Sequence, residues 1–296
     1  MHKFWSGLFG VVLAGCVLLF VVAPFVGWWL PQDAASYGSK VDGLFYLILA
    51  ITGIAFIGTE TVLVWAMWKF VARPGAKSPY THGNHKLEMI WTAVPAAILL
   101  FIAFAQVGAW ADIKYQSRMP DPDLVFEVSA RQFEWRFRYP TAETLDAMTK
   151  NWKGPGKDVA ADWEKKPHFD DIRVVNVVHV WKHTEKEPCR VRMFLKTKDV
   201  LHSFFLPNLR IKQDALPGKT IPVFFDATEA NVKWNAGTKK LESIGGKDKE
   251  WELACAELCG WGHYKMRGRL YVHETKKDYF DWLAAAAETQ RATKPE

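Results

Sequence analysis

Three long apolar runs occupy the first third of the chain. They cover residues 4–30, 44–68 and 89–110, and the only charged side chain inside them is Glu60. Each run has roughly 20 residues or more, the length that an α-helix needs to cross the hydrocarbon core of a bilayer. The pattern therefore predicts a multi-pass membrane protein with a helical, lipid-facing N-terminal part. A carboxylate inside a span is a candidate functional group, but we favour a Glu60 that is buried against a partner subunit.

The charges between the runs predict their orientation. The loop between the second and third runs carries four basic residues, Lys69, Arg73, Lys77 and Lys86, and no acidic one before Glu88 at the start of the third run. Because such basic loops remain in the cytoplasm, residues 31–43 and the chain from Asp112 onward are expected on the outer, periplasmic face of a bacterial cytoplasmic membrane.

The first run has two interpretations. Lys3, the apolar stretch and the sequence Leu-Ala-Gly-Cys ending at Cys16 resemble a lipoprotein signal, which would be cleaved before an acylated Cys16. The apolar run continues for fourteen residues beyond Cys16, however. This continuation favours an uncleaved span or anchor over residues 1–30.

After residue 112 the long apolar runs end, and hydrophobic residues tend to occur at every second position. Aromatic residues alternate with charged ones over 133–139, which is typical of a strand. Short strands separated by Pro and Gly turns predict an all-β sandwich or barrel. Further strand-like runs occur at 172–181, 190–196, 202–206, 221–226 and 268–273.

Two segments of this half break the strand pattern. Residues 141–170 are polar and without a clear period, so we interpret them as an insertion or long loop. Residues 278–289 have the pattern of a short amphipathic helix. The expected organisation is an N-terminal span or anchor, a helical hairpin, a β domain and a tail, at residues 1–30, 40–112, 113–284 and 285–296.

Composition excludes some classes of function. The chain has 38 Lys and Arg against 32 Asp and Glu, and this small surplus does not indicate a nucleic-acid-binding surface. Of its four cysteines, Cys16 lies in an apolar run and Cys189 stands alone, so no disulfide framework is indicated. The sequence has no Cys-x-x-Cys-His, and we expect no haem on this chain.

Candidate metal chemistry is concentrated near the C-terminus. Cys255 and Cys259 stand four apart, His263 follows four later, and Met266 three after that. Thiolate, imidazole and thioether groups together favour copper over hard cations, and a mononuclear blue-copper site needs only one Cys. Two thiolates can bridge two copper ions, with one imidazole for each, and His202 is available as the second imidazole. Zinc rarely uses Met, and a Cys255–Cys259 disulfide would leave His263 and Met266 without a role.

A second motif accompanies this one. Residues 199–218 run Asp-Val-Leu-His-Ser to a Pro-Gly turn through Lys212 and Asp214. With the 255–266 motif, with Leu-Glu-Met-Ile-Trp-Thr at 87–92 and with Gln-Phe-Glu-Trp at 132–135, the chain resembles subunit II of the haem–copper cytochrome oxidases. The resemblance covers roughly residues 40–140 and 172–282. It implies a cupredoxin-like sandwich that holds the dinuclear copper centre CuA.

The resemblance also implies roles for individual residues. The side chains of His202, Cys255, Cys259, His263 and Met266 would bind copper, together with the backbone carbonyl of Glu257. The Glu257 carboxylate would help to hold a magnesium ion shared with the haem-bearing subunit I. Lys212 and Asp214 would lie at that interface, although a surface pair before a turn is an equal interpretation. Glu88 would mark the entrance of a proton path, and simple complementarity to the helix dipole is the alternative.

The implied activity is electron input to an oxygen-reducing, proton-pumping oxidase. Electrons would come from a cytochrome c or a membrane-bound cytochrome, and subunits I and probably III would be partners. The family usually has Trp where this chain has Phe133, so electrons would enter at Phe133, at the nearby Trp135 or elsewhere. The basic stretch 182–198 predicts a surface that would not attract a strongly basic cytochrome.

The same motifs are compatible with other functions. A quinol oxidase subunit shares the fold but lacks the copper ligands, all of which are present here. A nitric oxide or nitrous oxide reductase module can carry a similar copper centre, but the membrane hairpin with Glu88 favours an oxidase over the latter. A membrane-tethered copper carrier is the alternative from a different class, and its copper site would be exposed and reversible.

Overall fold

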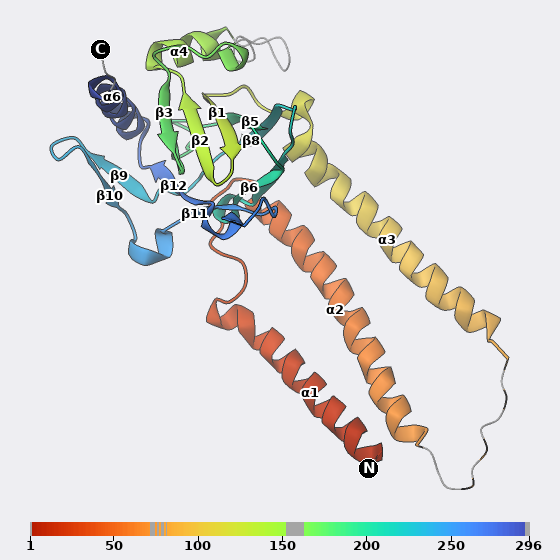
Figure 1. Cartoon of the computed structure of the whole chain (residues 1–296). Coiled ribbons are helices and arrows are strands. Elements are labelled where there is room, and N and C mark those ends of the chain that lie inside the picture. The colour runs from red at the N-terminus through yellow and green to blue at the C-terminus, as the bar shows by residue number, and fades with distance from the viewer. Residues whose placement is uncertain are drawn as a thin grey trace. The chain divides into compact units, whose positions relative to one another are not determined.

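The computed structural model describes residues 2–71, 75, 77, 80, 82–151 and 163–293 (Figure 1). The chain forms two compact units. One contains Met1–Pro31 and Lys40–Gly108, and the other contains Gln32–Ser39 and Ala109–Glu296. Each unit is described by itself.

The first unit is helical, as the apolar runs predict. Its helices are α1 (His2–Val22), followed by the 3-10 turn η1 (Ala23–Val26), α2 (Gly38–Lys69) and most of α3 (His85–Lys114). All three are long and apolar enough to cross a membrane. Helices suit this setting because they satisfy their backbone hydrogen bonds internally, without water. The helix α2 begins several residues earlier than the apolar run that predicts it.

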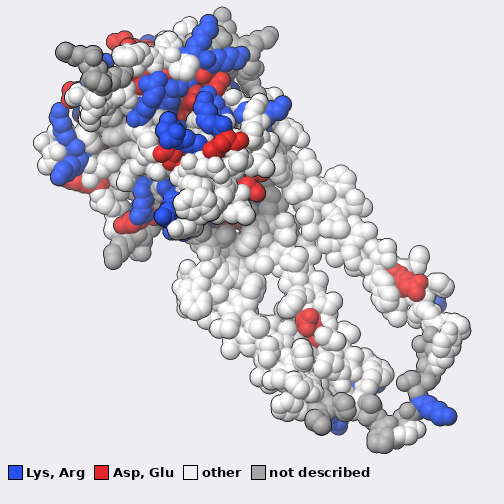
Figure 2. All heavy atoms as spheres, viewed as in Figure 1, with Lys and Arg blue, Asp and Glu red and all other residues white. Residues whose placement is uncertain are grey.

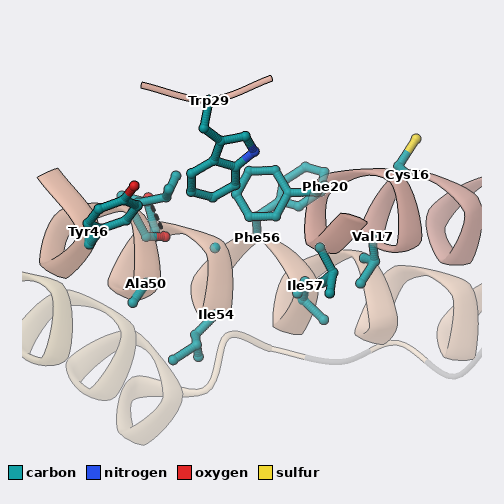
Figure 3. Close-up of a pocket in the computed structure, with 13 residues that line it drawn as sticks. Cys16, Val17, Phe20, Trp29, Tyr46, Ala50, Ile54, Phe56 and Ile57 are labelled. Carbon is teal, nitrogen blue, oxygen red and sulfur yellow. Dashed lines mark hydrogen bonds between the residues drawn. The ribbon is translucent and has the colours of Figure 1, made fainter. Parts of the chain in front are cut away.

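Helix α1 continues past Cys16 and packs on α2. The Ser6 hydroxyl donates a hydrogen bond to the Val64 carbonyl at 2.9 Å. The ring of Trp29 lies between Phe20 and Tyr46, with centroids 4.9 and 5.8 Å away. These residues and Cys16 line an apolar cavity of about 680 Å³ (Figure 3).

The second unit contains two β-sheets, which confirms the predicted sandwich. The first has the order β3-β2-β1-β5-β8, and the second has the order β10-β9-β12-β11-β6-β7 with β4 also paired to β12. The strands are β1 (Leu124–Arg131), β2 (Glu134–Tyr139), β3 (Ile172–Val175), β4 (Val177–Trp181), β5 (Val191–Thr197), β6 (His202–Leu206), β7 (Ile211–Ala215), β8 (Ile221–Phe225), β9 (Val232–Asn235), β10 (Lys240–Ser243), β11 (Glu252–Cys255) and β12 (Arg267–His273).

Alternation along β2 explains most of its packing. Trp135, Phe137 and Tyr139 are buried in the core, while Arg136 is exposed. Arg138 is the exception because its guanidinium is also buried. It pairs with Glu127 on the neighbouring β1 and with Asp171 at 2.8 Å, so its charge is compensated inside the protein.

The segment 141–170 is more ordered than a long loop. Thr141 caps α4 (Ala142–Lys150) by accepting a hydrogen bond from the Thr144 amide, as Thr commonly does at a helix start. Trp163 is buried, and its indole donates to Asp171 at 3.0 Å. The expectation of a long loop is therefore wrong for these described parts, whereas that of an insertion stays a prediction, and 152–162 lie outside the described residues.

The C-terminal helix α6 (Lys276–Ala292) contains the predicted 278–289 and extends it at both ends. Its Trp282 ring stacks on His179 of β4 with centroids 3.6 Å apart. The expected tail at 285–296 is thus helical as far as Ala292.

A short segment between the first two spans belongs to the sandwich unit. The Ala34 amide donates to the Asn208 carbonyl at 2.9 Å, and the Thr228 amide donates to the Ala34 carbonyl at 2.7 Å. The Ser36 amide also donates to the Asp226 carboxylate at 2.9 Å. These bonds fix the segment to the turns beside β6 and β8.

Candidate metal centre

The predicted ligands come from the adjacent strands β6 and β11 and from the loop that follows β11. His202 begins β6, Cys255 ends β11, and Met266 directly precedes β12. Two backbone hydrogen bonds close the loop at its base. The Cys255 amide donates to the Met266 carbonyl at 3.1 Å, and the Ala256 amide donates to the Ser203 carbonyl at 2.9 Å. Residues distant in sequence are thereby held together at one end of the sheet.

The five side chains converge on one another. The Cys255 and Cys259 sulfurs lie 4.0 Å apart. His202 Nδ1 lies 3.9 Å from the Cys255 sulfur, and His263 Nδ1 lies 3.7 Å from the Cys259 sulfur. The Met266 sulfur is 3.8 Å from the Cys259 sulfur, and the Glu257 carbonyl oxygen is 3.2 Å from the Cys255 sulfur.

This donor set fits copper. Both cysteines are free, and their sulfur separation is far longer than the ~2.05 Å of a disulfide. His202, Cys255 and Cys259 alone place their ligand atoms within 4.8 Å of one another. Soft thiolates and a thioether beside imidazoles favour copper over magnesium or calcium. Each thiol faces its own imidazole, so the arrangement suits two metal ions bridged by two sulfurs.

Most of the site is shielded from water. His202 and Met266 have no exposed surface, both thiols are buried, and His263 is half-buried. Burial opposes ionisation of Cys255, but hydrogen bonds from His202 and the backbone outweigh it and lower its pKa to about 6. Burial and the neighbouring Cys255 raise the pKa of Cys259 to about 11. The metal-free pair thus loses its first proton readily and holds the second, which a cation would displace.

A network behind the ligands orients them. The Asp199 carboxylate lies 2.9 Å from His202 Nε2 and accepts the Gln132 amide at 2.7 Å. The Gln132 side chain donates to the Cys259 carbonyl at 2.6 Å. The ring of Trp135 lies edge-on to His202, with centroids 6.1 Å apart. Because Asp199 contacts Nε2 of His202, the other ring nitrogen, Nδ1, faces the Cys255 thiol.

Comparison with protein-family models identifies both units. Residues 24–107 match the transmembrane domain of cytochrome c oxidase subunit II, and residues 124–239 match its periplasmic domain. The chain belongs to the cytochrome c oxidase subunit II family. It is accordingly membrane-anchored, with its β domain in the periplasm.

Curated relatives agree with this assignment. A cytochrome c oxidase subunit 2 of Synechocystis is 24% identical over 92% of this chain and 82% of its own length. An alternative cytochrome c oxidase subunit 2 of Bradyrhizobium diazoefficiens is 25% identical over 92% and 88%. The solved periplasmic domain of a Bradyrhizobium japonicum oxidase subunit II aligns over 59% of this chain and 97% of its own, at 19% identity and a TM-score of 0.36.

The other predicted residues of this subunit II family member lie outside the ligand cluster. Lys212, Asp214 and Glu257 are exposed, and Asp214 is in register with Ser203, the neighbour of His202. Phe133 is half-buried, whereas Trp135 is fully buried and offers a donor no surface.

The two membrane carboxylates that the sequence singled out belong to the helical unit. Glu88 is in the first turn of α3, with His85 Nδ1 3.1 Å from its carboxylate. Glu60 is half-buried within α2.

The basic stretch 182–198 is only partly available at the surface. Arg192 is buried, and Lys196 pairs with Glu127 and Glu164 at 3.0 Å. Arg190 pairs with Asp123 at 2.7 Å, whereas Lys186 and Lys198 are exposed. Buried or paired charges attract or repel a partner weakly, so this surface is less basic than predicted, and the choice of donor stays a prediction.

Three residues at or beside the metal centre were not predicted from the sequence. Asp199 and Gln132 belong to motifs that resemble the family, but their link to the ligands is a contact between distant segments. Trp261 lies between two ligands and is 86% exposed. Its flanking glycines were the one available signal, because Gly often allows close approach of other groups.

Proposed function

We propose that this chain is the electron-input subunit of a haem–copper terminal oxidase. It takes electrons from a c-type cytochrome at a dinuclear copper centre and passes them to the haem of subunit I, where oxygen reduction is coupled to proton pumping. The observation that carries the proposal is the convergence of two free thiols, two imidazoles and a thioether in one buried cluster of a subunit II family member.

His202, Cys255, Cys259, His263 and Met266 would hold the two copper ions, with the Glu257 carbonyl as a further ligand. When bound there, copper would supply a one-electron carrier, and the two thiolates of Cys255 and Cys259 would be shared between the two ions. The protein contributes rigidity, because the ligands are held by paired strands and by a loop hydrogen-bonded to Gln132. Ligands held in place by packing need little rearrangement when the charge changes.

The exposed side chains beside the cluster suit an interface with subunit I. Glu257 directs its carbonyl toward Cys255 while its side chain remains exposed. Its carboxylate is therefore available for a magnesium ion shared with subunit I, for which carboxylate oxygen is a preferred ligand. Lys212 and Asp214 extend from β7 beside the same cluster and would contact the same partner. Glu88 would lie at the start of the proton path.

The test is the metal content and spectrum of the oxidase purified through a tag on this chain. We expect two copper ions per chain, the near-infrared absorption and mixed-valence EPR signal of a dinuclear copper centre, and co-purification of a haem-bearing subunit. Cys255→Ser should abolish these signals and cytochrome c oxidation. Cys189→Ser, which changes a buried thiol elsewhere in the β domain, should retain both. Oxidation of cytochrome c at the wild-type rate by Cys255→Ser would refute the proposal.

A further inference from the structure

The ligand loop carries a large apolar side chain that faces solvent. Trp261 lies two residues from Cys259 and two from His263, and it is 86% exposed. Among the described large hydrophobic side chains of the β unit it is the most exposed. Exposing an indole in water is unfavourable, and tryptophan is enriched where one protein docks on another. Its position therefore points to a partner.

Trp261 is held outward by the residues around it. Its ring meets Phe133 edge-on, with centroids 5.8 Å apart and planes at 68°. A side chain at Gly262 would collide with the Phe133 ring, and Gly260 adopts a positive φ of 130°. Glycine on both sides of Trp261 thus lets the loop backbone pack closely against the Phe133 ring. This ring occupies the space beside the loop, and the indole is directed into solvent.

The two thiols have little surface of their own at which a donor could bind. Both are buried, as are His202 and Met266, and His263 is half-buried. Electron tunnelling weakens steeply with distance and runs better through bonds than through space. Trp261 is joined to Cys259 by a short stretch of backbone and to Phe133 by ring contact. It therefore offers a short path from a docked donor to a bridging sulfur.

The charges next to this aromatic pair nearly cancel. The neighbouring segments 131–136 and 198–199 hold three basic and two acidic side chains. Glu134 pairs with both Arg131 and Arg136, at 2.7 and 2.5 Å. Such a rim does not select a highly charged partner. It suits a donor whose exposed haem edge is surrounded by apolar and weakly charged groups.

We propose that Trp261, packed on Phe133, is the docking and electron-entry residue for a c-type cytochrome. One electron leaves the ferrous haem of the donor, which becomes ferric, and it is taken up at the copper centre without transfer of atoms. The inference rests on the proposed function and adds to it the surface at which the donor binds. In this arrangement the Phe133 ring packs against the Trp261 indole and holds it in position.

The experiment compares Trp261→Ala and Trp261→Leu in the purified oxidase complex. Phe169→Ala is the matched control, because Phe169 is a 76% exposed aromatic outside the ligand loop. Four quantities are measured: the copper spectrum, turnover with reduced cytochrome c, turnover with a small organic reductant, and the dissociation constant of the cytochrome from surface plasmon resonance.

We expect Trp261→Ala to lower kcat/KM for cytochrome c and its affinity by about tenfold or more, the loss typical of a central interface tryptophan. Trp261→Leu should regain part of the affinity but less of the electron-transfer rate. Turnover with the small reductant and the copper spectrum should not change, and Phe169→Ala should resemble wild type.

Unchanged kinetics and affinity for cytochrome c in Trp261→Ala would overturn the inference. Equal losses with both reductants, accompanied by a changed copper spectrum, would also overturn it, because Trp261 would then act by holding the loop. Failure of the proposed function is distinguishable from either result. In that case the wild-type complex itself would lack the copper signals or would not oxidise cytochrome c.

Discussion

Asp199 positions a ligand without being one. Its carboxylate lies 2.9 Å from His202 Nε2, on the opposite side of the ring from the Cys255 sulfur. It also receives the Gln132 amide at 2.7 Å, so its own orientation is fixed. A carboxylate can only accept a hydrogen bond, whereas the amide of Asn can also donate and so allow the other tautomer of His202.

We therefore expect Asp199→Asn to weaken copper binding by about 10- to 100-fold, as is typical when the partner of a ligating histidine is lost. The measurement is copper retained by the full-length chain against a competing chelator, followed by absorption. Asp146→Asn, a matched change on the exposed face of α4, should have no effect. Copper affinity equal to wild type in Asp199→Asn would show that packing alone orients His202.

At the residue scale, sequence could predict the part of the site that is local. Four of the five side-chain ligands lie within one loop, so their spacing displays the chemistry directly. His202 could be added because a second imidazole was needed. Gln132 and Cys259 are 127 residues apart, and only the fold brings them to 2.6 Å. The exposure of Trp261 likewise depends on Phe133 filling the space beneath the loop.

At the scale of elements, β2 presents two arginines in different settings. Arg138 is buried between Glu127 and Asp171, and its guanidinium stacks on Trp163 at 3.9 Å. Arg136, two residues earlier, is exposed and pairs with Glu134. The two ion pairs of Arg138 connect β2 with β1 and with the segment before β3. They therefore hold the first sheet and the 163–171 segment together.

We expect Arg138→Gln to reduce the free energy of unfolding by about 3–5 kcal/mol, because it leaves Asp171 buried without its cation and Glu127 with Lys196 alone. Arg136→Gln should cost no more than about 1 kcal/mol, the usual value of an exposed ion pair. Urea titration of the full-length chain in detergent, followed by tryptophan fluorescence, measures both. Similar losses for the two variants would mean that water enters the Arg138 cluster.

Elements with a strong hydrophobic period could be predicted, and weakly patterned ones could not. The alternating aromatic residues of β2 indicate its core face directly. The hairpin of β9 and β10 has mostly polar and exposed residues, and nothing in its pattern distinguishes it from a loop. Helix α4 was missed because it is short and polar, although Thr141 provides a recognisable cap. Both elements depend on neighbouring parts of the fold more than on their own apolar face.

At the scale of the whole molecule, charge separates the two units. In Figure 2 the Lys, Arg, Asp and Glu side chains gather on the β unit, while the helices show few. This distribution is the physical basis of the predicted spans and of their orientation, because charge is costly inside a bilayer. Residues 32–39 could not be assigned in this way, since their place in the β unit rests on hydrogen bonds to Asn208, Thr228 and Asp226.

The first span decides how the chain is anchored. Cleavage before Cys16 would remove Ser6, whose hydroxyl bonds to the Val64 carbonyl of α2 inside the membrane. It would also remove most of α1, which runs without interruption from His2 to Val22. The hydrogen bond of Ser6 and the other contacts of this part of α1 with α2, such as that of Lys3 with the Trp68 ring, would be lost with it. We therefore expect α1 to remain part of the mature protein.

We therefore predict that Cys16→Ser changes the mass of the chain only by the substitution itself. Retention of the chain in the membrane should equal that of the wild type. Intact-mass spectrometry of the purified complex should show residues 2–15 still attached and no lipid on Cys16 in the wild type. Ser6→Ala is the companion variant. It should lower the thermal stability of the helical unit slightly, because it removes one interhelical bond worth about 0.6 kcal/mol. A wild-type protein that begins at an acylated Cys16, and a longer uncleaved form in Cys16→Ser, would instead establish lipoprotein processing.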